Sequence, residues 1–434
     1  MAQYYVHVSL VLAFKLFLTQ SVEGSWTSFE GLSRTFIEVV SGSEERPQSR
    51  YAELLDYVQY HNPPYVQVDM EKELGIPQPS ISRFFSVMRE RARARVRLDF
   101  VHRLIGLRVV AVAYESSWLR SVPALDWVSS ISHTNSGTLI FYRVPEENVE
   151  DLREVLKEKA GEPSSFRVLD DVVLSKPSIK HYIAERESQN PLAALKENEN
   201  HPQVDPRLLL PYQSETMNLA RDYVDLYLLM RGEMDAVSAL IETWSTLATL
   251  NVGRAKRKVL YHLSHIAGAM RGSKVMLYDS SPNSTLVYAS VEGDRRCSKD
   301  VIKYFSTYLY TVAHMREKEG LPIVLFSLPP KYMVRVLSFV KEMCGATKIS
   351  SHVLPHGGTF FRQMLPIRNY DVNLKRWDFW NAPLLEALKK DFPKYQVSDE
   401  YFVEVPSEAY LEMLWEEMRR EEGEEKRENL RDIS

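Results

Sequence analysis

The hydrophobic pattern of residues 76–97 changes part-way from that of a helix to that of a strand. Four apolar residues follow the i, i+3, i+4, i+7 spacing of one helix face, namely Ile81, Phe84, Phe85 and Met88. Pro77 and Pro79 are unfavourable inside a helix, so the pattern predicts a helix that begins near Ser80, a good N-cap residue. Arginine then recurs at every second position from Arg89 to Arg97, which is the period of a strand.

Two more helical patterns precede this stretch. Residues 50–61 place leucine and valine on one face, and residues 68–74 form a short segment that Gly75 ends. The resulting order is helix, short helix, glycine turn, basic helix and basic strand. This order predicts a winged helix-turn-helix domain.

The polar face of the predicted third helix and the following strand carry the residue types that contact base edges and phosphates. We expect DNA contacts from Gln78, Ser80, Ser82, Arg83, Ser86, Arg89, Arg91, Arg93, Arg95 and Arg97. Eight arginines face two acids between residues 83 and 108, in a chain whose net charge is −4. Such a local excess favours a polyanion as partner, and the alternative is a solvated, salt-bridged helix end.

The next segment predicts a β-α-β-β-α-β, ferredoxin-like unit. Its strands and helices alternate as strand 107–115, short helix 122–128, strands 129–133 and 138–144, helix 148–160 and strand 166–174. A turn at Asn135-Ser136-Gly137 joins the two middle strands.

The same pattern returns later in the chain. It predicts strand 284–292, helix 299–309, strands 310–315 and 321–328, helix 332–343 and strand 348–354. Pro145 and Pro329 are separated by as many residues as Gly161 and Gly345, and the segments between them align without a gap. We interpret this as an internal duplication, the alternative being chance similarity between two common α/β units.

A second, degenerate helical module is expected before the second unit. Its predicted helices are 218–230, 236–249 and 254–270. The third of them carries cations that could contact phosphate, namely Arg254, Lys256, Arg257 and Lys258. Residues 383–422 can be aligned with the first winged helix as a third copy, but the helix from Ser407 is acidic, which favours a contact with protein.

Together these patterns predict an α+β chain in which winged helix-turn-helix domains alternate with ferredoxin-like domains. The expected divisions are an N-terminal extension (1–45), a winged helix-turn-helix (46–100), a ferredoxin-like domain (101–180), a linker (181–205), a degenerate helical domain (206–280), a second ferredoxin-like domain (281–366), an acidic winged-helix-like module (367–422) and a charged tail (423–434). The apolar start is too short to span a bilayer, so a packed helix or strand is expected, the alternatives being a signal peptide and a mis-called start.

This order resembles the Lrp/AsnC family of prokaryotic transcription regulators. The resemblance rests on ELGIPQPSISRFFSVMRE for the reading helix and on LRVVAVAYE with TLIFYRVPEENVEDLREVLKE for the regulatory domain. It covers residues 50–175 and, more weakly, 206–366. It implies that the ferredoxin-like domains pair, here within one chain, and that an amino acid-like effector or a homodimer could be involved. The arginine-rich wing departs from the family, and the composition is compatible with an archaeal source.

No enzymatic chemistry is expected. Nucleotide-binding glycine motifs, GxSxG and HExxH are absent, so we expect no catalytic residues and no cofactor. Cys297 and Cys344 are far apart and form no CxxC, which argues for a reducing compartment and against a disulfide scaffold. The histidine pairs His262/His265 and His352/His356 lack a ligand partner at a set spacing, so no metal is expected.

The sequence therefore predicts a cytoplasmic regulator that binds double-stranded DNA and no membrane. One alternative is an architectural DNA-binding protein without strong sequence preference. Another is a small-molecule sensor or enzyme of the ferredoxin-like class whose winged helices only dimerise.

Overall fold

The structure is a computed structural model. It describes residues 48–61, 65–90, 95–115, 119, 122–124, 127–174, 176, 192, 219–231, 241, 252–276, 285–292, 297, 301, 304–305, 311–317, 322–328, 330–345, 348–354, 361–362 and 369–380. The N-terminal extension, nearly all of the linker, most of the predicted helices 236–249 and 299–309, residues 381–422 of the acidic third module and the charged tail lie outside these residues. Within the described part of the chain, no helix is long and apolar enough to cross a bilayer.

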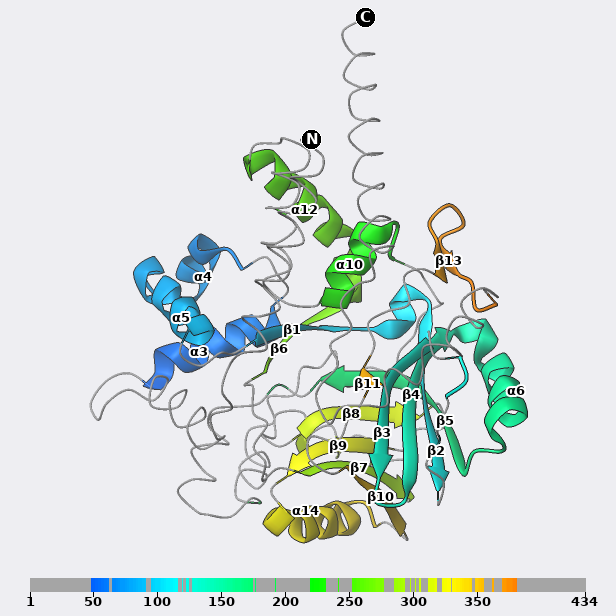
Figure 1. Cartoon of the computed structure of the whole chain (residues 1–434). Coiled ribbons are helices and arrows are strands. Elements are labelled where there is room, and N and C mark those ends of the chain that lie inside the picture. The colour runs from blue at the N-terminus through cyan, green and yellow to red at the C-terminus, as the bar shows by residue number, and fades with distance from the viewer. Residues whose placement is uncertain are drawn as a thin grey trace, which may run out of the picture.

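The first module is a group of three helices followed by a strand (Figure 1). Its elements are α3 (Gln48–Tyr60), α4 (Gln67–Leu74), α5 (Gln78–Glu90) and β1 (Arg95–Phe100). Leu54 and Val58 of α3, Met70 of α4 and Ile81 and Phe84 of α5 are all buried. The helices therefore pack through the apolar faces that the sequence predicts.

The start of α5 differs from the prediction. The helix begins at Gln78, because the carbonyl oxygen of Pro77 accepts hydrogen bonds from the amides of Ser80 (2.9 Å) and Ile81 (3.2 Å). Pro79 thus lies in the first turn, where an amide has no partner within the helix and proline is tolerated. Ser80 is therefore inside the helix and is not its N-cap.

Two similar groups of strands form one large sheet. The first group is β2 (Leu107–Glu115), β3 (Val128–Thr134), β4 (Gly137–Pro145) and β5 (Ser165–Leu174), with α6 (Val149–Ala160) before β5. The second is β7 (Thr285–Glu292), β8 (Thr311–Glu317), β9 (Pro322–Leu328) and β10 (Lys348–Leu354), with α14 (Pro330–Met343) before β10. The α+β class is confirmed, and the strands lie where the alternating patterns predict them.

The sheet has nine strands in the order β10-β7-β9-β8-β5-β2-β4-β3-β11, where β11 is Phe361–Arg362. Each group repeats the order fourth, first, third, second strand, as expected for a duplication. The two groups join where β5 pairs antiparallel with β8, from Leu169 opposite Glu317 to Leu174 opposite Ala313. We call the two groups the first and second halves of the sheet.

The two halves fold back so that their inner faces meet. Along β2, Val110 and Val112 pack in the core under α6, whereas Val109, Ala111 and Ala113 pack against Tyr288 of β7 and Ile323 of β9. In Figure 1, α6 and α14 lie on the outer sides of the two halves. Because β2 is buried on both faces, its sequence is almost continuously apolar.

The predicted short helix 122–128 is present in its described positions only as short turns. Pro123 and Ala124 form a turn, and Trp127, which has 3-10 helical conformation, donates its amide to the carbonyl of Ala124 (2.9 Å) just before β3. Ala124 has φ +50°, a left-handed conformation that does not fit an α-helix. Val122, Ala124 and Trp127 are all buried in the core.

A second helical module lies beside the strand pair β1–β6 (Figure 1). It contains α10 (Tyr223–Arg231), α12 (Val252–Ile266), a short 3-10 turn η4 (Ala267–Ala269) and β6 (Met270–Met276). Strand β6 pairs antiparallel with β1, so that Arg95 lies opposite Met276 and Phe100 opposite Met270. The predicted wing strand therefore joins the first module to the second.

A short β-hairpin rich in aromatic residues contacts the chain near Ile105 and near Ala220. It consists of β12 (Tyr370–Asp371) and β13 (Arg376–Trp377). The Trp377 Nε1 donates to the carbonyl of Ile105 (2.6 Å), and the Tyr370 hydroxyl donates to that of Ala220 (2.7 Å). Trp377 and Phe379 are buried and Trp380 is exposed, so the aromatic residues mainly join modules.

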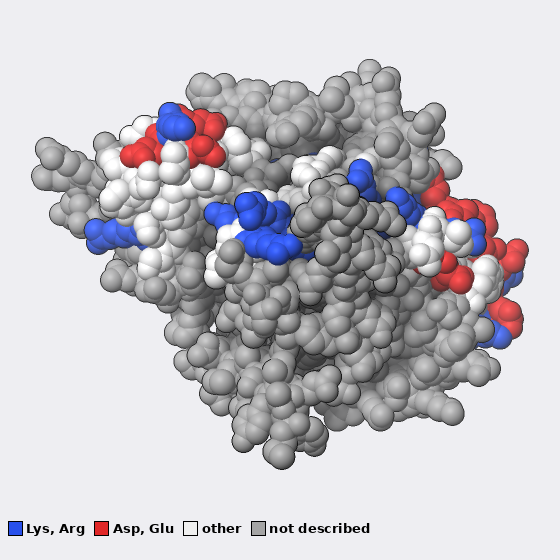
Figure 2. Space-filling view, turned by 90° about the horizontal axis from the view of Figure 1, so that it is seen from above, with Lys and Arg blue, Asp and Glu red and all other residues white. Residues whose placement is uncertain are grey.

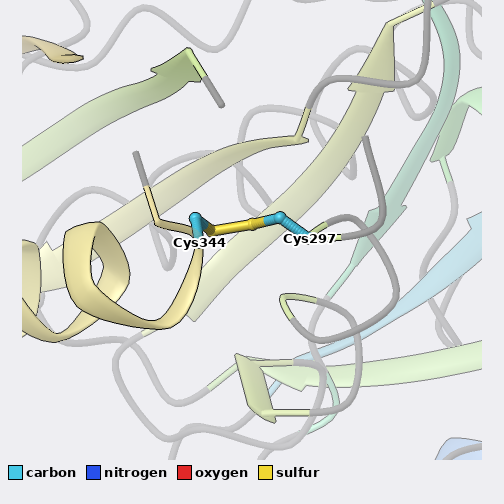
Figure 3. Close-up of a disulfide and its surroundings, with 2 residues drawn as sticks. All are labelled: Cys297 and Cys344. Carbon is cyan, nitrogen blue, oxygen red and sulfur yellow. A yellow bond between two sulfur atoms is a disulfide. The ribbon is translucent and has the colours of Figure 1, made fainter. Parts of the chain in front are cut away.

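Cys297 and Cys344 form a disulfide, contrary to the expectation from their spacing (Figure 3). Their Cα atoms lie 4.9 Å apart, and both residues are buried in the core between the second half of the sheet and α14. The bond links the end of α14 to a residue 47 positions earlier in the chain. The wide spacing of the two cysteines in the sequence therefore did not predict this bond.

Candidate functional site

Helices α4 and α5 are joined by a short turn at the position of the predicted helix-turn-helix. Gly75 ends α4 in a left-handed conformation (φ +64°), and its amide donates to the carbonyl of Glu71 at 2.8 Å. Ile76 in the turn is buried, which fixes the angle between the two helices. The turn thus holds α5 against α4 through an apolar contact and leaves the other face of α5 outward.

The outward face of α5 carries several of the predicted DNA contacts. Ser82 and Arg83 are exposed, and Ser80 and Ser86 are partly exposed. Gln78 is also partly exposed, but its Nε2 donates to Glu71 Oε2 at 2.7 Å, so it braces α5 against α4. Arg89 lies in α5, and Arg95 and Arg97 in β1, but their side chains are outside the described part of the structure, as are Arg91 and Arg93.

Part of the predicted arginine excess is neutralised by carboxylates. Arg108 is buried, and its guanidinium lies 2.6 Å from Glu146, a carboxylate that also lies 3.8 Å from Arg103. Asp99 forms a buried ion pair with Arg271 of β6 (3.3 Å). Arg103 and Arg108 therefore stabilise the fold. The arginines that remain available to contact a polyanion are those from Arg83 to Arg97.

A second group of cations lies on α12. Lys256 and Arg257 are exposed, and Arg254 and Lys258 are partly exposed, while Ala255 and Val259 face the core. Figure 2 shows lysine and arginine side chains gathered over α12 in the middle of this face, with acidic side chains towards its edges. The predicted cations of this helix are thus on the surface, within one and a half turns.

A separate small cavity lies between the inner faces of the two halves of the sheet. Its volume is about 120 Å³, and it opens beside Ala111 and Ala113 of β2 and Ser290 of β7. These residues are small, so they leave a space between the two halves of the sheet that larger side chains would fill. The remaining lining is mostly polar and comprises Glu115, Ser164, Ser165, Arg167, Tyr288 and His352, with Leu139 as an apolar wall.

The strand register positions the charged groups of the cavity. Arg167 of β5 lies opposite Ala111, and its Nε donates to Ser165 Oγ at 3.1 Å. His352 of β10 lies opposite Tyr288 of β7, with ring centroids 5.7 Å apart. Burial lowers the pKa of His352, and Arg167 lowers it further while Glu115 opposes both. The cavity thus combines a guanidinium, a neutral imidazole and a carboxylate, which suits a small ligand with both charges.

Sequence reasoning missed these cavity residues. They come from β2, β5, β7 and β10, and only the fold-back of the sheet brings them together. One feature of the sequence could have indicated the cavity, namely the two alanines in LRVVAVAYE. Both are small residues for a strand that is buried on both faces.

Two solved structures match along most of the chain. Both are of the siroheme decarboxylase NirDL, one alone and one in complex with an iron-uroporphyrin III analogue. The TM-scores are 0.41 and 0.42, with 10% and 11% sequence identity over 79% of this chain and 98% of that chain. No protein-family model and no curated protein sequence matches.

The expectation that the chain is not an enzyme is corrected by this comparison. The solved structures that match it are those of an enzyme, and they match along nearly their whole length. At this similarity the match concerns the fold alone. Any activity of this chain must be argued from its own residues.

Proposed function

We propose that this chain is a transcription regulator that reads double-stranded DNA through α5. The observation that carries the proposal is the helix-turn-helix geometry itself. Gly75 sets the turn, Ile81 and Phe84 hold α5 to the module, and Ser82 and Arg83 remain exposed on the opposite face. An exposed, polar and basic helix face of this kind fits the major groove.

The proposal gives each group of predicted residues a role. Ser80, Ser82, Arg83, Ser86 and Arg89 would face base edges. Arg91, Arg93, Arg95 and Arg97 would contact the sugar-phosphate backbone or the minor groove. Arg254, Lys256, Arg257 and Lys258 on α12 would add phosphate contacts. The winged helix-turn-helix and ferredoxin-like domains would alternate with the boundaries given above, and the two ferredoxin-like domains would pair within one chain.

The first experiment compares DNA binding of Arg83→Ala with that of Arg335→Ala, an exposed arginine on α14 in the second half of the sheet. If Arg83 reads a base, its loss weakens binding to the preferred DNA sequence by about 1–3 kcal/mol. It also relaxes the preference for the base that Arg83 contacts. The Arg335 variant should bind as the wild type does. Equal loss on all sequences would show that Arg83 contacts only phosphate.

The second experiment tests the basic strand by replacing Arg93, Arg95 and Arg97 with alanine. Each lost phosphate contact should reduce the slope of log affinity against log salt by about 0.9. The Lys256→Ala, Arg257→Ala double variant tests α12 in the same way. An unchanged slope in either case would remove that element from the interface.

An architectural role without sequence preference is the alternative use of the same surfaces. Cations on both α5 and α12 could coat or bridge DNA. Footprinting of genomic fragments separates the two, because a regulator protects discrete sites and an architectural protein protects the fragments evenly.

We further propose that the cavity binds a small amino acid-like effector. Arg167 would hold a carboxylate and Glu115 an ammonium group. Calorimetry with a panel of amino acids should give saturable binding that Arg167→Gln weakens. Arg153→Gln, which changes an exposed residue of α6 that does not line the cavity, should not weaken it. Binding that is indifferent to Arg167 would place the effector elsewhere.

A second candidate function is catalysis on a small carboxylic acid in the same cavity. Arg167 can orient the carboxylate, and His352, whose pKa burial lowers, can accept a proton. Incubation with amino acids and other small carboxylic acids, followed by mass spectrometry, tests for product. Product that forms in the wild type and not in His352→Gln supports catalysis, and binding without product supports the effector role.

A further inference from the structure

Four metal-ligating side chains meet between α10 and α12, away from the cavity and from the outer face of α5. Asp222 and Asp225 come from the start of α10, and His262 and His265 from the second half of α12. One ligand atom from each lies within 4.8 Å of every other. Each pair has i, i+3 spacing, which places its two members on one helix face.

The cluster is buried to an unusual degree for charged groups. The exposed fractions of the side chains are 0% for Asp225, 1% for His262, 8% for His265 and 13% for Asp222. Two carboxylates are thereby enclosed beside each other with no lysine or arginine in an ion pair with them among the described residues. Buried carboxylates normally require a partner cation or a metal.

Three contacts in the cluster have the separation of neighbouring ligands of a tetrahedral zinc ion. His262 Nδ1 lies 3.1 Å from Asp225 Oδ1 and 3.4 Å from Asp222 Oδ2, and His265 Nδ1 lies 3.3 Å from the other Asp225 oxygen, Oδ2, while the four ligand atoms together spread over up to 4.8 Å. Ligands about 2.0 Å from a tetrahedral ion are about 3.3 Å from one another. Side chains at these separations need only small rotations to enclose one ion.

One nitrogen in the cluster lacks a hydrogen-bond partner. His265 Nδ1 is buried and, despite its short distance to Asp225 Oδ2, it forms no hydrogen bond of acceptable geometry. A ring nitrogen aimed into a set of carboxylates without a hydrogen bond is in the position of a metal ligand. The other ring nitrogen, Nε2, lies 3.5 Å from Arg221, whose exposed side chain can move when Nε2 carries the proton.

The helix start already fixes the carboxylates. Asp222 Oδ1 accepts the amide of Asp225 (2.8 Å), and Asp225 Oδ2 accepts the amide of Arg221 (2.9 Å). These are helix-capping bonds that hold both side chains in place before any ion binds. Such outer bonds commonly orient the ligands of protein metal sites.

We propose that Asp222, Asp225, His262 and His265 form a structural site for a divalent transition-metal ion, with zinc the best fit. Two imidazole nitrogens and two carboxylate oxygens are ligands that zinc prefers, and four protein ligands complete its coordination. The ion joins the start of α10 to the end of α12, at the opposite end of α12 from its cations. It thereby holds the basic helix in place, independently of what that helix binds.

The test uses the full chain without a histidine tag. After removal of metal with a chelator, addition of zinc should give one bound ion per chain and raise the unfolding temperature. Cobalt should give the intense visible absorption of a tetrahedral ion. No bound ion, or cobalt with an octahedral spectrum only, overturns the proposal.

Variants exclude binding elsewhere on the chain. His265→Gln should lower zinc affinity more than about 100-fold, as removal of a direct ligand exceeds the effect of an outer partner. Asp222→Asn retains the helix cap and should lose affinity while remaining folded, as checked by circular dichroism. His61→Gln, which changes a partly exposed histidine 3.3 Å from Glu73, should bind zinc as the wild type does. Equal binding by all variants overturns the proposal.

Discussion

Individual residues at the junction of the modules determine how closely the segments approach. Arg271 of β6 forms an ion pair with Asp99 of β1 and donates to the carbonyl of Val172 at 2.7 Å, so one side chain joins three strands. The next residue, Gly272, has φ +87° and lies against the backbone of α3. Any side chain at position 272 would therefore push α3 away from β6.

We therefore expect Gly272→Ala to destabilise the chain by about 1–3 kcal/mol, because a Cβ there would lie 2.3 Å from the carbonyl oxygen of Gln59. Gly161→Ala is the matched control, since Gly161 also has a positive φ (+89°) but no atom within 4 Å of the added Cβ. Thermal unfolding of both variants separates the steric clash from backbone strain. Equal losses would show that the approach of α3 can relax.

His102 makes stability depend on pH. Burial lowers its pKa well below the ordinary value of 6.5, and Arg143 and Arg271 lower it further. The unfolded chain therefore binds a proton that the folded chain does not, once the pH falls below about 6.5. Stability should be complete above that pH and fall below it, by up to about 1.4 kcal/mol per pH unit for one histidine.

The measurement is urea unfolding between pH 7.5 and 5.5 for the wild type, His102→Asn and His61→Asn. His102→Asn should show a shallower loss of stability on acidification, and His61→Asn should follow the wild type. If His102→Asn is as acid-sensitive as the wild type, the pH dependence comes from other groups.

At the scale of elements, the local sequence pattern predicted most of the strands and helices. It could not predict which distant strands pair. Strands β2, β4 and β10 and helix α6 lie at or within one or two residues of their predicted bounds, because alternation and helical spacing are local properties. The pairing of β1 with β6 involves residues far apart in sequence, with no shared period to reveal it. The left-handed Ala124 interrupts the predicted helix 122–128, of which a 3-10 turn at Trp127 is described, and both residues are buried in the core.

The same limit applied to the candidate sites. The exposed face of α5 followed from one helix pattern, so Ser82 and Arg83 could be placed from the sequence. The proposed metal-binding cluster could not be predicted from the sequence, because its aspartates and its histidines come from distant segments of the chain. The i, i+3 spacing within each pair of residues is too common to indicate a metal site by itself. The cavity needed the fold-back of the whole sheet.

The disulfide links elements of the second half of the sheet, and its removal should lower their stability. Closing a loop of 47 residues stabilises a chain by about 4 kcal/mol in the loop-entropy model. We expect a reductant to lower the unfolding temperature of the wild type and to leave the Cys297→Ala, Cys344→Ala double variant unchanged. Two reactive thiols in the unfolded, non-reduced wild type would contradict the bond.

At the scale of the whole molecule, the two halves of the sheet are held at both ends. The pairing of β5 with β8 forms one connection. At the other, the turn between β3 and β4 reaches β10, where Asn135 Oδ1 accepts the amide of Val353 (3.0 Å) and Ser136 Oγ lies 2.9 Å from His352 Nδ1. The turn was predicted from Asn135-Ser136-Gly137, but its contact with β10 depends on the second half.

This second connection should control access to the cavity, because His352 both lines the cavity and contacts the turn. Losing two hydrogen bonds at about 0.5–1.5 kcal/mol each leaves the β5–β8 pairing intact, so the Asn135→Ala, Ser136→Ala double variant should stay folded. Hydrogen exchange should accelerate in the turn and in β10 but not in β5 or β8, and binding in the cavity should weaken. Asn148→Ala is the matched control, because its bond to Asp151 (2.6 Å) lies within one half and should leave exchange in β10 unchanged. If exchange in β10 is unaffected in the double variant, the side chains of Asn135 and Ser136 play no part in holding the halves together, and packing with the backbone bond from the Asn135 amide to the Val353 carbonyl (3.0 Å), which the variant keeps, is sufficient.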